Sequence, residues 1–294
     1  MWICKDWKDY EILDISSGDK LEVWNGYKLI RPDPQVIWDE RQFPALWKDA
    51  HARYNRSKSG GGSWDFNKKL PDQWDVNFEP LGLKFLIKPM GFKHTGLFPE
   101  QAANWMWFSD IIKKAAPKRP VKVLNLFAYT GGATVAAAAA GASVVHVDSS
   151  KGMVTWAKEN LNASGHGDKF VRFIVDDAIK FVEREIRRGN RYDGIIMDPP
   201  SYGRGPGGEV WKIEDEIYPL VQKCSQILSD NPLFFLINSY TTGLQASVLT
   251  NILTLTVGKK YKGTIVSDEL GLPVKNTNLV LPCGASGRFE AEGI

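Results

Sequence analysis

VKVLNLFAYTGG, residues 121–132, is an apolar run that leads directly into a glycine-rich turn. A helix pattern of small residues follows, and then a second apolar run that ends at Asp148. Apolar strands that alternate with helices are typical of a parallel sheet covered by helices on both faces. The alternation continues, so we expect strands at 121–127, 143–148, 170–175, 192–198 and 233–239, and helices at 133–140, 150–164, 178–188 and 214–228.

The two ends of the chain differ from this pattern. Residues 262–270 and 279–284 predict a closing strand pair, which gives the fold class α/β: a Rossmann-like, mostly parallel sheet with a closing antiparallel strand. The first 78 residues hold seven of the eleven tryptophans and short alternating runs, with a hairpin signal at Asn25-Gly26. Residues 83–98 suggest another hairpin. We therefore expect a small β-rich N-terminal domain over 1–80 and a sheet domain over 81–294.

Composition narrows the class of protein. A hydrophobic content of 43% and a charged content of 24% are ordinary for a soluble globular chain, and the charged residues near Met1 do not resemble a signal peptide. The three cysteines lack metal-site spacing, so we expect no metal and a cytoplasmic, non-membrane location. Basic residues interleave with aromatic ones between Arg41 and Lys69, a composition that suits phosphates and stacked bases. The oligomeric state stays open.

Chemical groups follow four consecutive strands. The first strand ends in the turn at 127–132, the second at Asp148, the third at Asp176-Asp177, and the fourth at Asp198-Pro199-Pro200. Proline lacks an N–H and cannot continue a central strand, so two in a row end the fourth strand abruptly. Ligands of open α/β sheets bind outside the carboxyl ends of the strands, and we expect a site there.

The absence of two known binding motifs narrows the range of possible ligands. The turn has neither the G-x-G-x-x-G pattern of dinucleotide sites nor the lysine of a P-loop, so a pyrophosphate or triphosphate has no cradle. An adenosine with a charged tail free of phosphate fits better, with Asp148 on the ribose and Asp177 and Ala178 on the adenine. That description matches S-adenosylmethionine. The residues that we expect to bind it are Asn125, Phe127, Ala128, Tyr129, Thr130, Gly131, Gly132, Asp148, Ser149, Asp177 and Ala178.

These motifs, with Asp198-Pro199-Pro200-Ser201-Tyr202 and Val210-Trp211, resemble class I S-adenosylmethionine-dependent methyltransferases. Within that class, residues 84–290 resemble the bacterial large-subunit ribosomal RNA cytosine-C5 methyltransferase group, and residues 91–101 are similar to a segment ahead of that group's cofactor fold. The resemblance implies a methyltransferase that acts on RNA, with the loop at 127–131 at the methionine end of the cofactor. It implies a reaction centre at Asp198, Pro199, Pro200 and Tyr202.

The sequence departs from the cytosine-C5 methyltransferase group at the residue on which that reaction depends. Methylation of a pyrimidine at carbon 5 needs a cysteine thiolate, which that group carries beside the Pro-Pro motif or after the fifth strand. Here Ser201 and the run Asn238-Ser239-Tyr240 stand at those places, and the positions of Cys224 and Cys283 predict buried structural thiols. Direct attack by a nitrogen or oxygen is the alternative, with the Asp-Pro-Pro motif orienting an amine.

Other functions remain open at this point. The chain could methylate a small molecule or a protein, or it could bind RNA without catalysis through a retained cofactor pocket. A dehydrogenase that uses NAD is disfavoured by the missing glycine pattern and by the Asp-Pro-Pro motif. The glycine-rich run at 203–208 is a candidate lid over the substrate.

Overall fold

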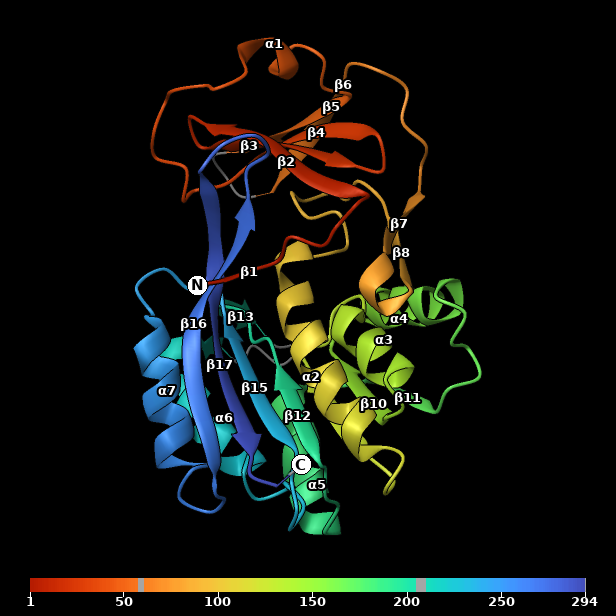
Figure 1. Ribbon diagram of the computed structural model, residues 1–294, viewed down its shortest axis with the longest axis vertical. Coiled ribbons are helices and arrows are strands. Elements are labelled where there is room, and N and C mark those ends of the chain that lie inside the picture. Colours follow the sequence, from red (N-terminus) through yellow and green to blue (C-terminus); the bar gives the residue numbers. More distant parts are fainter. Residues whose placement is uncertain (58–60, 205–209, 294) are drawn as a thin grey trace. The chain divides into compact units, whose positions relative to one another are not determined.

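The alternation of strands and helices forms one mixed sheet in the computed structural model, which describes residues 1–57, 61–204 and 210–293 (Figure 1). The strand order is β1-β16-β17-β15-β12-β9-β10-β11. Strands β9, β10, β11, β12 and β15 run parallel, and β17 pairs with β15 in the antiparallel sense. The predicted Rossmann-like sheet with its closing antiparallel strand is confirmed. The strand bounds are β1 (Trp2–Ile3), β9 (Lys122–Leu126), β10 (Ser143–Asp148), β11 (Val171–Val175), β12 (Gly194–Met197), β15 (Phe234–Ser239), β16 (Gly263–Pro273) and β17 (Val280–Ala291).

The chain forms two compact units. The sheet unit comprises Met1, Ala103–Leu270 and the chain from Gly284 onward. The N-terminal unit comprises Trp2–Ala102 and the return segment Gly271–Cys283, so the far ends of β16 and β17 belong to it. The division at residue 80 that the sequence predicts, as a boundary between domains, stays a prediction.

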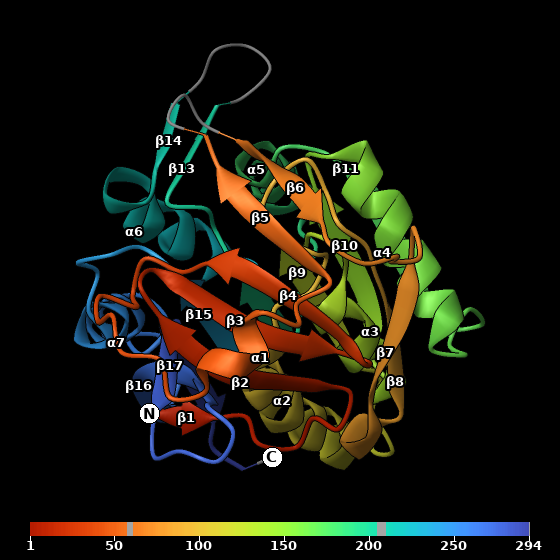
Figure 2. The same ribbon diagram turned by 90° about the horizontal axis from the view of Figure 1, so that it is seen from above.

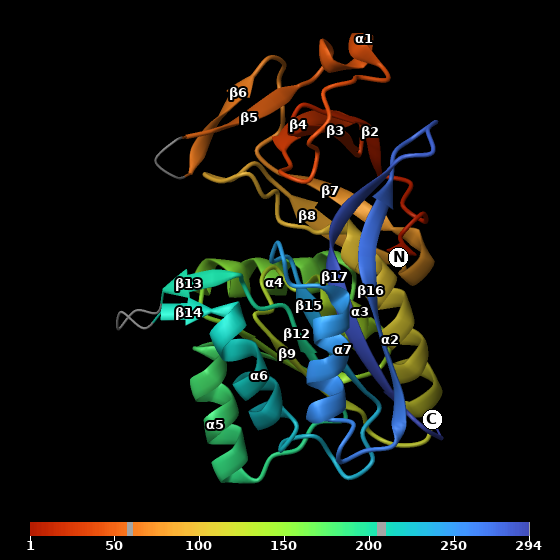
Figure 3. The same ribbon diagram turned by 90° about the vertical axis from the view of Figure 1, so that its left-hand side faces the viewer.

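Helices cover both faces of the sheet, because successive strand residues point to opposite faces. Leu124 and Leu126 of β9 pack in a buried cluster with residues of α5, α6 and α7, which lie on one face (Figure 3). Asn125 points to the other face, where it contacts Thr134 of α3. The helix bounds are α2 (Ala102–Ala115), α3 (Gly132–Ala139), α4 (Lys151–Ala163), α5 (Ala178–Arg188), α6 (Ile213–Cys224) and α7 (Ala246–Leu255). The sequence predicts no element at α7, whose β-branched residues favour a strand as much as a helix.

The N-terminal unit is built around a five-stranded sheet in the order β2-β3-β4-β5-β6. The predicted hairpin at Asn25-Gly26 is confirmed: both residues have positive φ, which a tight two-residue turn between β3 and β4 requires. Figure 2 shows β5 and β6 side by side at the end of this sheet. The bounds are β2 (Tyr10–Ser16), β3 (Asp19–Trp24), β4 (Tyr27–Pro32), α1 (Pro44–Trp47), β5 (Ala52–Arg56) and β6 (Gly62–Phe66).

The predicted hairpin over 83–98 is wrong. Strand β8 (Leu83–Ile87) pairs instead with the strand before it, β7 (Trp74–Phe78), through a 3-10 turn at Glu79–Leu81 and the left-handed Gly82. Pro89 lies two residues after β8 and cannot donate to a sheet, so no strand continues the pairing beyond it. Residues 88–98 are a connecting segment that leads to a second 3-10 turn, Pro99–Gln101.

Candidate active site

The sheet brings the predicted site segments to one edge. Leu126 of β9 is paired with Val147 of β10 on one side and with Met197 of β12 on the other, and Asp148 is paired with Val175 of β11. The carboxyl ends of all four strands therefore lie in neighbouring positions. The segments that follow them, 127–132, 148–150, 176–178 and 198–202, share this edge as the sequence predicts.

The loop after β9 has an uncommon backbone. Phe127, Tyr129 and Gly131 all have positive φ, at 53°, 50° and 81°. Such values are strained for non-glycine residues and gather at functional sites. The loop is fixed to the sheet by Ala128, whose N–H donates to the Val147 carbonyl at 3.0 Å.

Two glycines let the loop pack against the helices. A Cβ at Gly131 would lie 2.8 Å from the Cβ of Ala157 in α4, and a Cβ at Gly132 would lie 2.6 Å from the ring of Trp105 in α2. Both distances are too short for carbon atoms, and Gly131 also has positive φ. The pair Gly131-Gly132 is thus required for close approach of the loop to both helices.

A neutral polar network lies beneath the loop. The Asn125 Nδ2 donates to Thr134 Oγ1 at 2.9 Å, and Thr134 Oγ1 lies 2.9 Å from His146 Nδ1. A hydroxyl has one proton and two acceptor positions, so Thr134 Oγ1 can accept from Asn125 and still pair with His146 Nδ1. Burial lowers the pKa of His146 to about 3, so the imidazole is neutral. His146 is fully buried in the core, and its Nε2 has no partner in the part of the chain that the structure describes.

The loop is also tied to α4. Asn160 Nδ2 donates to the Thr130 carbonyl at 2.8 Å, and Asn125, Thr130 and Asn160 are all buried. The side chain of Asn125 and the carbonyl of Thr130 thus support the loop from inside. That either residue also contacts a cofactor stays a prediction.

Asp148 is held by the backbone of two loops. Its Oδ2 accepts the N–H of Tyr129 and its Oδ1 accepts the N–H of Ser150, both at 2.8 Å. Burial raises the pKa of this carboxyl, and the two N–H groups counteract the rise. Each carboxylate oxygen can accept about two hydrogen bonds, so each keeps one further acceptor position. Two adjacent hydroxyl groups of a ribose match that pair. Ser149 lies between Asp148 and Ser150, whose N–H binds the Asp148 carboxylate.

The third strand end is organised by helix capping. Asp177 caps α5, because its Oδ1 accepts the N–H of Lys180 at 2.9 Å, and Ala178 is the first residue of that helix. The first N–H groups of a helix have no partner within it and can face a ligand. Asp176 forms an ion pair with Arg184, and its N–H donates to the Asp148 carbonyl at 3.1 Å. This last contact places the third strand end directly beside the second.

Trp211 connects the Asp-Pro-Pro motif to the loop that follows β9. The Trp211 Nε1 donates to the Pro200 carbonyl at 2.5 Å, and its ring lies 5.4 Å from that of Phe127, centroid to centroid. Trp211 belongs to β14 (Val210–Lys212), which pairs with β13 (Tyr202–Arg204). Tyr202 is 51% exposed on that hairpin. The candidate lid at 203–208 falls mainly on residues 205–209, outside the described residues.

The end of the fifth strand joins the site through Thr241, a residue that the sequence analysis did not single out. Thr241, just after β15, donates its hydroxyl to Ser201 Oγ at 2.7 Å. The contact depends on β15 pairing with β12, a tertiary feature. The only signal in the sequence was that a threonine follows the fifth strand.

Comparison with known proteins agrees with this geometry. A family model described as S-adenosylmethionine-dependent methyltransferase matches residues 51–224. The chain belongs to this family. A solved structure, the SAM-dependent methyltransferase from Agrobacterium tumefaciens, is 35% identical with a TM-score of 0.90, and the match covers 98% of this chain and 92% of that one. The protein is therefore a methyltransferase whose cofactor is S-adenosylmethionine, as the sequence predicts.

Two relatives that are similar to this methyltransferase are named as ribosomal RNA methyltransferases. Ribosomal RNA large subunit methyltransferase K of Neisseria meningitidis is 29% identical over 246 residues, 81% of this chain and 67% of that protein. Ribosomal RNA large subunit methyltransferase K/L of Shewanella frigidimarina is 33% identical over 159 residues. That match covers 53% of this chain and only 21% of the relative, so the chain spans about a fifth of the longer protein.

The cysteine thiols of this methyltransferase do not readily ionise to the thiolate, which is the nucleophilic form of cysteine. Burial raises the pKa of the Cys4 thiol to about 11, and it also raises the pKa values of Cys224 and Cys283 well above their ordinary value. The predicted burial of Cys224 is confirmed, since it is fully buried at the end of α6, whereas Cys283 on β17 is only partly buried. The described residues hold no cluster of three metal-binding side chains and no helix long and apolar enough to cross a membrane.

Proposed function

We propose that this methyltransferase acts on a base of RNA, and that ribosomal RNA is its substrate. The names of the relatives from Neisseria and Shewanella support this substrate. The basic and aromatic composition between Arg41 and Lys69 supports it independently. The observation that carries the proposed site is the common edge at which Asp148 and the Asp198-Pro199-Pro200 motif follow neighbouring parallel strands.

The strained loop and Asp148 would hold the cofactor. The free acceptor positions of the Asp148 carboxylate fit the two ribose hydroxyls, and Asp177 with the N–H of Ala178 would contact the adenine edge. Phe127, Ala128, Tyr129 and Gly131 would line the methionine end. When bound, S-adenosylmethionine supplies an electrophilic methyl group.

The Asp-Pro-Pro motif would orient the acceptor. Trp211 donates to the Pro200 carbonyl and so fixes the motif, and the Pro199 carbonyl and the Asp198 carboxylate would accept hydrogen bonds from an exocyclic amine. These two acceptors fix the direction of the nitrogen lone pair, and the carboxylate can take the proton that the amine loses. Orientation of this kind supplies much of the rate in group transfer. Tyr202 on the adjoining hairpin could stack on the base.

The same geometry argues against carbon-5 chemistry. That reaction needs a thiolate, and Ser201 stands beside the motif with its oxygen bound by Thr241. All three cysteine thiols have raised pKa values. A nitrogen or oxygen acceptor is therefore the one that this site fits.

Two aspartate variants test the division of roles. Asp148→Ala should weaken binding of S-adenosylhomocysteine by about 10- to 100-fold in calorimetry, because hydrogen bonds to a charged group contribute about 1.5–3 kcal/mol. Asp198→Ala should bind it normally and lose methyl transfer to RNA. The exposed Asp168→Ala is the matched control and should change neither quantity. Full activity of Asp198→Ala would refute the proposed reaction centre.

Mass spectrometry of nucleosides tests the substrate. Ribosomal RNA from cells that lack this chain should miss one methylated nucleoside, and the purified protein should restore it. A modified base with the methyl on nitrogen is the expected product. A normal nucleoside profile in those cells, with methyl transfer to protein instead, would overturn the RNA substrate.

A further inference from the structure

The edge of the N-terminal sheet carries an aromatic row. Tyr54 of β5 faces Trp64 of the edge strand β6, with ring centroids 5.4 Å apart, and Phe66 follows on the same face at 6.5 Å and 27° from Trp64. Burial decreases along this row, because Tyr54 is buried, Trp64 is half-buried and Phe66 is 59% exposed. An exposed, nearly parallel aromatic pair on an open edge is a surface on which flat rings can stack.

The segment 90–94 is fastened to the same face. The Trp64 Nε1 donates to the Met90 carbonyl at 2.8 Å, and the Tyr54 hydroxyl lies 3.5 Å from the Gly91 carbonyl. Phe92, the next residue, is 47% exposed. The attachment therefore adds Phe92 as a second exposed aromatic ring to the surface and places Lys93 beside it.

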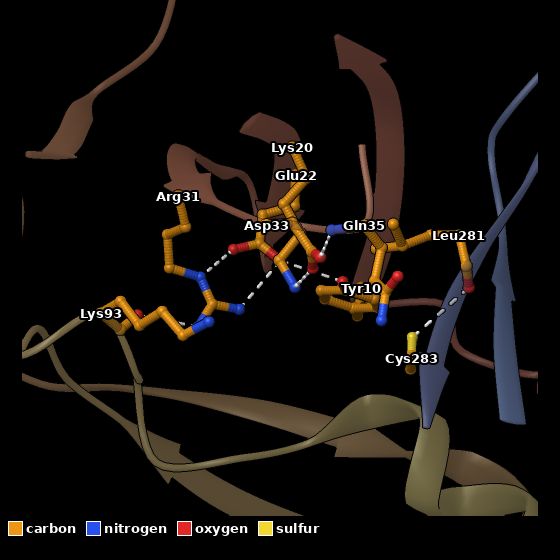
Figure 4. Close-up of polar contacts among 9 residues, drawn as sticks. All are labelled: Tyr10, Lys20, Glu22, Arg31, Asp33, Gln35, Lys93, Leu281 and Cys283. Atoms are coloured by element: carbon orange, nitrogen blue, oxygen red, sulfur yellow. Dashed lines mark hydrogen bonds and ion pairs between the residues drawn. The ribbon is translucent and has the colours of Figure 1, made fainter. Parts of the chain in front are cut away.

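Lys93 joins a charged cluster that has more cations than carboxylates. Arg31 binds Glu22 and also donates to the Lys93 carbonyl at 3.0 Å (Figure 4). Lys20 pairs with Asp33 at 3.2 Å. The two ion pairs engage Asp33 and Glu22, the two carboxylates of the cluster. Neither Lys93 nor Arg56 forms an ion pair within the described part of the chain.

The unpaired lysine is partly buried. Burial, together with the positive charges of Lys20, Arg56 and Arg31, lowers the pKa of Lys93 to about 8. An ammonium group withdrawn from water beside other cations is unfavourable unless an anion neutralises it. The cluster thus has the charge of an anion site, next to rings that can stack.

We propose that Arg56, Trp64, Phe66, Phe92 and Lys93 form a surface that binds single-stranded RNA. The cations contact phosphates and the aromatic rings stack on unpaired bases, the two interactions that proteins use to bind single strands. This inference rests on the proposed function in taking RNA as the substrate. It adds a second place on the chain, apart from the Asp198 site, where that substrate is held. Bases in a duplex are already stacked, so the surface selects single strands.

The test measures binding of a fluorescently labelled oligoribonucleotide, about 12 nucleotides long, to the full-length protein by anisotropy. Phe66→Ala should weaken binding about tenfold or more, because it removes a stacking surface without a buried contact. Phe170→Ala is the matched control, since Phe170 is 70% exposed but belongs to the sheet unit. The control should bind as the unchanged protein does.

A charge variant tests the phosphate contacts separately. For single strands, the logarithm of the binding constant falls with the logarithm of salt concentration by about 0.7 per phosphate contact. The double variant Arg56→Gln/Lys93→Gln should therefore reduce this slope by about 1.4. The control pair Lys158→Gln/Lys259→Gln removes two exposed lysines of the sheet unit and should leave the slope unchanged.

The outcomes separate this inference from the proposed function. If the unchanged protein binds S-adenosylhomocysteine but no RNA at low salt, the RNA substrate itself is wrong. If it binds RNA and the Phe66 and cation variants bind equally well, only the surface is wrong. Equal affinity for a duplex of the same length, or preferential binding of a peptide along β6, would also overturn the surface.

Discussion

Each unit buries a polar network, and the two networks are built in opposite ways. In the sheet unit, Asn125, Thr134 and His146 form a neutral chain beneath the loop that follows β9. In the N-terminal unit, Glu22 accepts from Arg31 and from the Tyr10 hydroxyl, with all three side chains almost fully buried. The first network contains no charge and the second depends on one.

The difference follows from what each network must do. A neutral network can lie directly under the loop at 127–132 without competing with the charge of Asp148. The ionic network needs both partners: burial raises the pKa of Glu22, but Arg31 and Lys20 lower it more, so the carboxylate stays ionised. Burying an ion pair brings little net stability, whereas losing one partner is severe. The ionic network therefore makes the N-terminal unit sensitive to single substitutions.

The largest expected effect comes from breaking the ionic pair. Arg31→Met should reduce the free energy of unfolding of the N-terminal unit by about 3–5 kcal/mol, because Glu22 is left charged and buried without its partner. Urea denaturation followed by tryptophan fluorescence measures this, since seven of the eleven tryptophans lie in the first 78 residues. Glu22→Met/Arg31→Met should recover most of the loss.

An exposed ion pair of the same unit provides the control for that experiment. Lys275 pairs with Glu11 at 2.7 Å, and the two side chains are 46% and 37% exposed. Lys275→Met should change the free energy of unfolding by less than about 1 kcal/mol. Equal losses from Arg31→Met and Lys275→Met would show that burial of the pair does not matter.

Acid should act on the neutral network through His146. Its pKa in the folded protein, about 3, lies below the ordinary 6.5, so on acidification the unfolded chain takes up the proton first. Stability that is complete above pH 6.5 is then lost by up to about 1.4 kcal/mol per pH unit as the pH falls. The slope of unfolding free energy between pH 7 and 5 should be smaller in His146→Asn. His94, with a similarly low pKa, is present in both proteins and cancels. Identical slopes would contradict the assignment.

The smallest effect should come from Thr134. Thr134→Val leaves Asn125 and His146 without their shared partner and should reduce the free energy of unfolding of the sheet unit by about 1–3 kcal/mol. Thr134→Ser keeps the hydroxyl and should retain most of the stability. Chemical denaturation measures both. If the valine variant were as stable as the serine variant, the Thr134 hydroxyl would not contribute to the free energy of unfolding.

Local patterns predicted much of the sheet unit. The apolar runs ended where the strands end, and β10 and α5 have the predicted bounds. The mistaken hairpin over 83–98 shows the limit of such patterns. Strand β8 pairs with β7, and pairing depends on which neighbour supplies a matching strand and turn, here through Gly82. Helix α7 was missed because its β-branched residues leave its conformation to packing, and Leu249 and Leu253 are fully buried.

The sequence by itself determined the alternation of strands and helices from β9 to β15, the glycine turn and the residues that follow each strand, because apolar periodicity and turn chemistry are local. It thereby determined the family and the cofactor. Only the tertiary structure decided that Trp211 occupies the Pro200 carbonyl, that Thr241 binds Ser201, and that Lys93 lies in a cluster of cations. These contacts join residues on separate elements, and burial sets their charge and pKa. No local pattern in the chain encodes them.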